Sequence, residues 1–244
     1  MKKILTKITA VLIAIFGIFV FAGCGDEFAN AQQITKAEAL HYAETYEESY
    51  EQLAQGYKMT ATEKFDGMDA SIEMQLLTDQ SFNVTGLALT MRGNINNEAL
   101  NAKVYVKNSK LYIDAKIGKN TVKVKTDYSS SALATRAVWA QTALSMLEDM
   151  GDMVFDMLAE TSTQYPTADI TVKMLGTMES GNVKFQIKAN EIVDNFTNTS
   201  TVVVEYKNNK LQTMKIDAIA KNASLNFYAE RITSISYPNL AYFG

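Results

Sequence analysis

Reactive side chains are scarce in this chain. It has one cysteine, Cys24, and one histidine, His41, among its 244 residues. A single cysteine excludes an internal disulfide framework, so the fold must be held together by burial alone. The sequence also lacks G-x-S-x-G and S-x-x-K nucleophile motifs and a glycine-rich phosphate loop. We therefore identify no catalytic residue, and we expect a protein that is not an enzyme and uses no cofactor.

The lone histidine is a weak metal-ligand candidate. His41, Glu44 and Glu48 are spaced so that a helix would place them on one face. Carboxylate metal centres in helical bundles, however, need Glu-x-x-His pairs on two helices, and a second histidine is absent. We interpret His41 as a solvated helix residue and predict no metal site.

Excess positive charge is also missing. The formal net charge is -4, whereas a nucleic-acid partner would require a basic field. Proline is rare, with two residues in the whole chain, which suits long uninterrupted strands. The composition thus excludes a nucleic-acid-binding protein and favours an ordinary globular domain.

The first residues have the three segments of a secretory signal. Basic residues at Lys2, Lys3 and Lys7 precede an apolar run over residues 8–21, and small residues follow. The run is shorter than the ~20 residues that cross a bilayer core. We therefore predict a signal peptide over residues 1–23.

The stretch that ends this signal, Phe21-Ala22-Gly23-Cys24, resembles the lipobox of bacterial lipoproteins. Phe21 departs from the Leu, Val or Ile that is usual at its position in that family. The resemblance implies that a diacylglycerol is attached to the Cys24 thiol after cleavage. It implies an extracytoplasmic protein anchored to the bacterial cell membrane by its N-terminal acyl chains, with residues 24–34 as a tether and 35–244 as a single domain.

Two helices are expected. Thr35-Lys36-Ala37-Glu38 matches a capping box, and an apolar stripe continues to about Gln55. A longer apolar stripe over residues 131–161 predicts a central helix, which carries several methionines on or beside the stripe.

Most of the remaining chain alternates apolar and polar residues, as strands do. Turns at Asn108-Ser109, at residues 118–120 and at Asn208-Asn209 separate neighbouring strands, and a last strand is expected near residues 232–237. We expect an α+β fold in which a large curved antiparallel sheet, or half-barrel, has its concave face covered by the N-terminal helix and the long central helix.

Methionine is abundant on the presumed apolar side, at Met74, Met91, Met146, Met150, Met153, Met157, Met174 and Met214. Methionine fills irregular cores and also lines adaptable binding surfaces, so both readings stay open. The candidates for lining a cavity are Val104, Val106, Leu111, Ile113, Met146, Met150, Met153, Met157, Phe185, Ile187 and Ile216.

A lipoprotein with such a sheet and covering helix resembles the LolA/LolB and LppX/LprG group over about residues 35–238, in pattern rather than in a specific motif. The resemblance implies a half-open barrel that carries acyl chains of lipids or lipoproteins. Our leading hypothesis is a membrane-anchored carrier or sensor that binds a lipid or another apolar ligand non-covalently. The alternative is a surface lipoprotein with a solid core that binds an envelope protein.

Overall fold

The structure is a computed structural model, and it describes residues 26–45, 56–65, 68–79, 84–95, 98–128, 158–159, 168–193 and 195–243. The predicted signal peptide and Cys24 lie outside these residues. So do Met146, Met150, Met153 and Met157, and all of the helix expected over residues 131–161 except Leu158 and Ala159.

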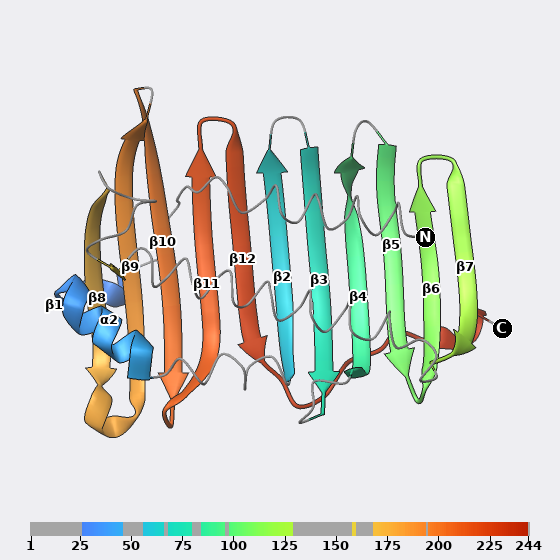
Figure 1. The fold of residues 1–244 in the computed structure, drawn as a ribbon, viewed down its shortest axis with the longest axis horizontal. Coiled ribbons are helices and arrows are strands. Elements are labelled where there is room, and N and C mark those ends of the chain that lie inside the picture. Colours follow the sequence, from blue (N-terminus) through green and yellow to red (C-terminus); the bar gives the residue numbers. More distant parts are fainter. Residues whose placement is uncertain are drawn as a thin grey trace.

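The described residues form one antiparallel sheet of twelve strands, in the order β1-β8-β9-β10-β11-β12-β2-β3-β4-β5-β6-β7 (Figure 1). The strands are β1 (Gln32–Ile34), β2 (Gly56–Phe65), β3 (Met68–Thr78), β4 (Val84–Ile95), β5 (Glu98–Lys107), β6 (Lys110–Ile117), β7 (Asn120–Asp127), β8 (Asp169–Thr177), β9 (Asn182–Val193), β10 (Phe196–Lys207), β11 (Lys210–Ala220) and β12 (Ala223–Arg231).

The sheet is built from two meanders. β2 to β7 pair in sequence order, β8 to β12 do the same, and β12 joins them by pairing along β2 from Arg231↔Tyr57 to Ala223↔Phe65. β7 and β1 are the two edges of the open sheet, and β8 lies next to β1. The chain between β7 and β8 therefore connects opposite ends of the sheet.

The predicted antiparallel sheet is confirmed, but the α+β class with two covering helices is wrong for the described residues. Strand accounts for 71% of them, and one short α-helix is present, α2 (Lys36–Thr45). Residues 46–55, the rest of the expected N-terminal helix, lie outside the described residues. Sequence periodicity is a local signal that marks where a helix can form, and tertiary packing decides whether it does, because short helices are marginal in water.

The start of α2 follows the predicted capping box. Glu38 accepts hydrogen bonds from the Thr35 amide and hydroxyl, both at 2.8 Å, and the Glu38 amide donates to the Thr35 hydroxyl at 3.1 Å. These bonds satisfy amides that a helix N-terminus leaves without partners. They also lower the pKa of the Glu38 carboxyl, chiefly through the bond from the Thr35 amide.

The predicted hairpin turns are confirmed. Asn108 and Ser109 link β5 to β6 with φ values of 50° and 57°, and Asn208 and Asn209 link β10 to β11 with 52° and 59°. Two successive residues with positive φ make the turn whose twist matches that of paired strands. Asparagine tolerates this left-handed conformation better than most residues, which explains its recurrence at these turns.

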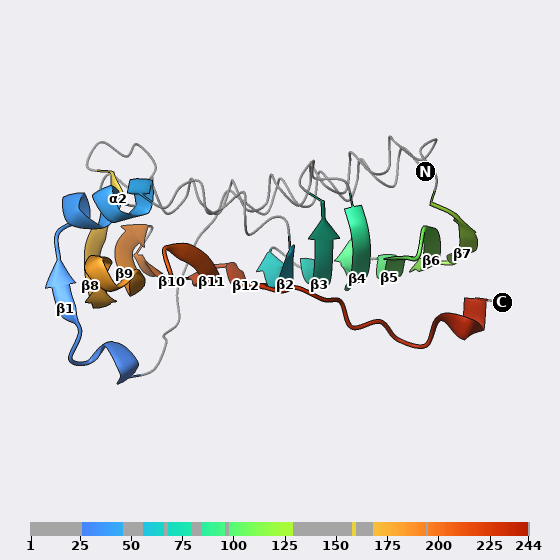
Figure 2. The same ribbon diagram turned by 90° about the horizontal axis from the view of Figure 1, so that it is seen from below.

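The segment before β1, expected to be part of a tether, packs on the sheet. A 3-10 turn, η1 (Asp26–Phe28), buries Phe28, whose carbonyl accepts a hydrogen bond from Lys173 Nζ at 3.1 Å. Glu27 pairs with Lys184 at 2.7 Å. Figure 2 shows η1 and α2 on opposite sides of the sheet with β1 between them, so the N-terminal segment passes around this edge.

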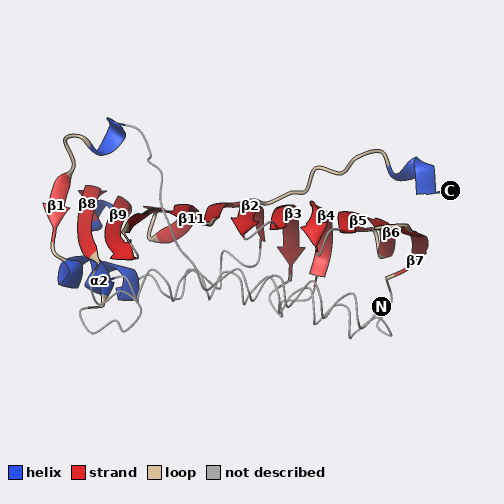
Figure 3. Cartoon of the chain, turned by 90° about the horizontal axis from the view of Figure 1, so that it is seen from above, coloured by secondary structure: helices blue, strands red, loops and turns tan. Residues whose placement is uncertain are grey.

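The C-terminal segment corrects a second expectation. Residues 232–239 form no strand. They cross the side of the sheet opposite α2 and end in η4 (Leu240–Phe243) near β7 (Figures 2 and 3). Gly86 of β4 makes room for this crossing, because a Cβ atom there would lie 2.8 Å from the Tyr237 hydroxyl oxygen. The alternation of residues 232–237 resembled a strand, but its side chains pack across other strands.

Specific contacts attach this C-terminal segment to the first meander. The Ser236 amide donates to Gln75 Oε1 at 3.0 Å, and the Tyr237 hydroxyl donates to the Val106 carbonyl at 2.7 Å. The Phe243 ring meets Tyr112 edge-on with centroids 5.3 Å apart. The segment thus braces β3 to β6 on the polar side of the sheet.

Candidate functional site

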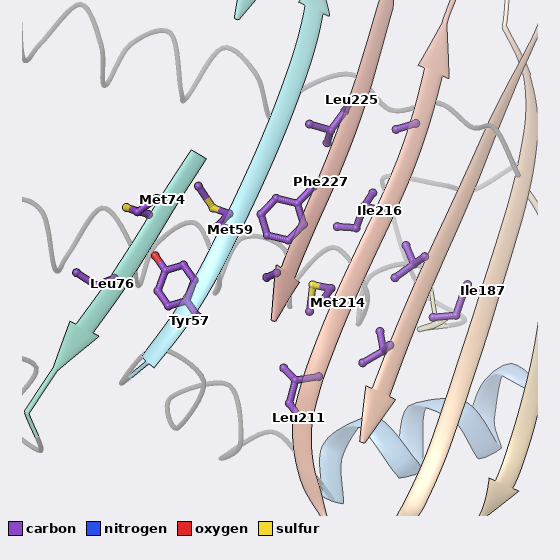
Figure 4. Close-up of a cluster of buried hydrophobic side chains, with 14 of the residues drawn as sticks. Tyr57, Met59, Met74, Leu76, Ile187, Leu211, Met214, Ile216, Leu225 and Phe227 are labelled. Carbon is purple, nitrogen blue, oxygen red and sulfur yellow. The ribbon is translucent and has the colours of Figure 1, made fainter. Parts of the chain in front are cut away.

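The two faces of the sheet differ sharply in chemistry. We call the face that carries α2 the apolar face and the opposite one the polar face. Strand register aligns alternate residues into rows across the apolar face. One such row reads Met174, Phe185, Val204, Met214, Ala229, Met59, Met74, Leu89, Val104, Ile113 and Val124. The buried hydrophobic side chains of this face form one cluster, the apolar cluster. Figure 4 shows part of it.

The structure describes seven of the residues predicted to line a cavity, and all seven belong to the apolar cluster or pack against it. Val104, Val106, Leu111, Phe185, Ile187 and Ile216 are buried, and Ile113 is packed against them. They come from both meanders, so the sheet brings together residues more than a hundred positions apart. Their role in holding a ligand stays a prediction.

The described methionines of the predicted set, Met74, Met91, Met174 and Met214, are buried on the apolar face as expected. Met59 joins them and is fully buried, although the sequence analysis did not single it out. Met59, Met74 and Met214 belong to one row. Polarizable, unbranched side chains are therefore concentrated at the middle of the sheet, where the two meanders meet.

Among the described residues, two parts of the chain pack on the apolar face. α2 lies over its β8–β9 end, where the Tyr42 ring stacks on Phe185 with centroids 5.6 Å apart. Leu158, from the segment between β7 and β8, is buried in the same cluster. β7 carries Val122 and Val124 on this face with exposed fractions of 45% and 37%, so the face becomes accessible toward that edge.

Two polar side chains interrupt the apolar face where β12 meets β2. Tyr57 is fully buried, and its hydroxyl has no hydrogen-bond partner among the described residues. Burial raises the pKa of the Tyr57 hydroxyl far above its ordinary value. Arg231 pairs directly with Tyr57 across the two strands, and its Nε donates to the Leu211 carbonyl at 3.2 Å. Burial lowers the pKa of the Arg231 guanidinium.

A carboxyl group lies on the same face at the other end of β2. Glu63 occupies a row between Leu225 and Ala70, and among the described residues it has no hydrogen-bond or ion-pair partner. Desolvation raises its pKa from 4.5 to about 7. An unpaired carboxyl in apolar surroundings favours the neutral form, because burial penalises its charge.

Sequence reasoning did not single out these three polar residues, although it had a signal available. Tyr57, Met59 and Ala61 alternate in the apolar pattern, and Glu63 breaks it at the next position. Leu225, Phe227 and Ala229 alternate in the same way before Arg231. A charged residue at the apolar position of a regular alternation is therefore the feature that would have identified Glu63 and Arg231, whereas Tyr57 fits the apolar pattern and gives no such signal.

The polar face is lined by charged and hydroxyl side chains, and Asp217 is the one buried acid among the residues that the structure describes there. Asp217 is buried and accepts a hydrogen bond from Asn226 Nδ2 at 2.7 Å as well as a short one from Lys215 Nζ. Tyr105 and Val203 are also buried on this side. The face is thus closely packed around its own side chains and the C-terminal segment.

His41 is exposed on α2, in agreement with the interpretation of a solvated helix residue. Within the described ranges, no group of three or more His, Cys, Asp or Glu side chains is placed to hold a metal ion. Within the same ranges, no helix has the length and apolar character needed to cross a membrane.

Comparisons with known proteins give a distant likeness. No family model matches the chain, and no curated protein matches it in sequence. Among solved structures, the crystal structure of LprF from Mycobacterium bovis is similar over 82% of this chain and 96% of that chain, with 10% identity and a TM-score of 0.36. This likeness is coarse, so function has to be argued from the residues of this chain.

Proposed function

We propose that this protein is a membrane-anchored lipoprotein that binds an apolar ligand, a lipid or an acyl chain, non-covalently against the apolar face of its sheet. The observation that supports this is the continuous apolar face, which runs through every strand from β8 to β6 and concentrates methionines at its centre. Binding sites for small ligands are mostly apolar with a few placed polar groups, and Tyr57, Arg231 and Glu63 are such groups here.

The proposed anchor is the Cys24 thiol, in an extracytoplasmic protein of the bacterial cell envelope. Phe28 is buried on the sheet, so the chain between the folded domain and Cys24 is very short. Only Gly25 separates Cys24 from Asp26, and the two residue steps reach about 7 Å at most. An acylated Cys24 would therefore hold η1 and the neighbouring β1–β8 edge close to the lipid headgroups.

The anchor is tested by replacing the thiol. Cys24→Ala removes the attachment point, and we expect the protein to move from the membrane fraction to the soluble fraction, because two or more acyl chains are needed for stable membrane attachment. Membrane fractionation followed by immunoblotting measures this. Retention of the variant on membranes to the same extent as the wild type would contradict an acyl anchor at this position.

Ligand binding is tested by native mass spectrometry on the chain that begins at Gly25, which keeps every described element. We expect a mass shift from co-purified lipid after mild purification. Met59→Trp adds bulk on the apolar face and should reduce lipid occupancy, whereas Thr60→Trp, the next residue on the same strand, points to the polar face and should not. Circular dichroism establishes that both variants are folded before their masses are compared.

A second candidate function is a protein-interaction module. The observation that favours it is β7, an edge strand in which every residue is exposed and whose outer backbone groups face no described strand. Exposed edges can pair with a strand of another protein. A lipid-free mass for the wild-type protein would overturn the carrier proposal and leave the interaction module as the better account.

A further inference from the structure

The hydroxyl of Tyr57 is the most unusual polar atom on the apolar face. It is completely buried, and none of the described residues accepts a hydrogen bond from it. A buried donor left without an acceptor is costly, and buried hydroxyl groups in folded proteins almost always have a partner. A tyrosine whose hydroxyl makes no hydrogen bond to any described residue is therefore a candidate for contact with a ligand.

The surroundings of this hydroxyl show what kind of ligand atom would fit. Leu76 faces Tyr57 on β3, and Met59 follows it on the same face of β2 (Figure 4). On the other side, Arg231 of β12 pairs with Tyr57. A hydroxyl donor, with a cationic residue paired to it on the neighbouring strand, matches an acceptor oxygen, charged or uncharged, while the leucine and methionine side chains match hydrocarbon.

The strand itself gives the dimensions. From Tyr57 the apolar face of β2 continues through Met59 and Ala61 to Glu63. The six residue steps from Tyr57 to Glu63 span about 20 Å, and the acyl chains of one membrane leaflet extend about 15 Å, half of a roughly 30 Å hydrocarbon core. An acyl chain whose oxygen lies at Tyr57 would thus lie along apolar residues and end before Glu63.

We propose that the Tyr57 hydroxyl donates a hydrogen bond to an oxygen of the bound ligand, which is an acyl lipid with its carboxylate or ester carbonyl at the Tyr57–Arg231 end of β2 and its chain directed along β2 toward Glu63. This inference rests on the proposed function, since it specifies the ligand of the same face. It makes the site selective for acyl compounds over plain hydrocarbon of equal length.

The test uses the full chain in mild detergent and measures binding by native mass spectrometry with three probes of one chain length: palmitic acid, methyl palmitate and hexadecane. Tyr57→Phe removes the hydroxyl and keeps the ring. We expect it to weaken binding of the acid and the ester about five- to ten-fold and to leave hexadecane binding unchanged. Tyr105→Phe, a buried tyrosine on the polar face, is the matched control and should bind all three probes like the wild type.

The two oxygen-bearing probes identify the acceptor. Weaker binding of both probes by Tyr57→Phe assigns the bond to a carbonyl oxygen that acid and ester share, and weaker binding of the acid alone assigns it to a carboxylate beside Arg231. Because the variant loses an unsatisfied buried donor, its melting temperature after removal of co-purified lipid should be equal to that of the wild type or about 2 to 4 °C higher.

Each failure has a distinct signature. If the wild type binds none of the probes, the proposed function itself is overturned. If the wild type binds them and Tyr57→Phe binds them equally well, ligand binding stands and the role of the hydroxyl is overturned. A lower melting temperature for Tyr57→Phe would mean that the hydroxyl has a partner within the protein, which also overturns the inference.

Discussion

Replacing Glu63 with glutamine should change how the stability of this protein depends on pH. The carboxyl lies on the apolar face between Leu225 and Ala70 without a described partner, and burial raises its pKa from 4.5 to about 7. In the unfolded chain the group loses its proton near 4.5, whereas in the folded protein it keeps the proton until about pH 7. Between these values the folded state binds more protons, so the free energy of unfolding falls as the pH rises.

The size of the effect follows from the two pKa values. They differ by about 2.5, which corresponds to about 3.4 kcal/mol at about 1.36 kcal/mol for each pKa unit. Solvent reaches part of the side chain, and screening reduces the contribution to about 1 to 2 kcal/mol. Glu63→Gln removes this pH-dependent penalty. The free energy of unfolding of the variant relative to the wild type should therefore be about 1 to 2 kcal/mol larger at pH 8 than at pH 4.

Urea denaturation at several pH values from 4 to 8 measures the free energy of unfolding of the wild type and the variant. The difference between the two curves isolates Glu63 from every other titrating group. Glu73→Gln is the matched control, because Glu73 is exposed on the polar face of the neighbouring strand β3, and its curve should run parallel to the wild-type curve. A Glu63→Gln curve that also runs parallel to the wild type would refute the reasoning.

Two further predictions concern the frame that holds the sheet. Ser109 has a φ of 57° in the β5–β6 turn, so Ser109→Gly should stabilise the protein by about 0.5 to 1 kcal/mol in urea denaturation, while Ser109→Ala should give no gain. Tyr237→Phe removes the 2.7 Å bond to the Val106 carbonyl and should cost about 1 kcal/mol. Tyr242→Phe, whose hydroxyl is 3.4 Å from Asp114, should cost less than half of that. Equal losses for both tyrosine variants would contradict the larger contribution assigned to the Tyr237 bond.

The alternation of apolar and polar residues was enough to predict which side chains of the candidate site lie on the apolar face. The side chains of Val104, Val106 and Phe185 were assigned to the apolar face from period-two patterns, and the structure places them there. Alternation assigns a face because successive strand residues point to opposite sides. It does not reveal which strands become neighbours, so the meeting of Tyr57 with Arg231 could not be predicted.

The sequence by itself determined the local structure: the turns at Asn108-Ser109 and Asn208-Asn209, the capping box at Thr35 and Glu38, and the apolar side of each strand. These depend on backbone preferences and on hydrogen bonds between residues close in the chain. Only the tertiary structure decided that β12 pairs with β2. The tertiary structure also decided that the segment after Arg231 crosses the polar face, although its alternation had predicted a strand. Contacts between distant residues are selected by packing over the whole sheet, and local patterns carry little information about that choice.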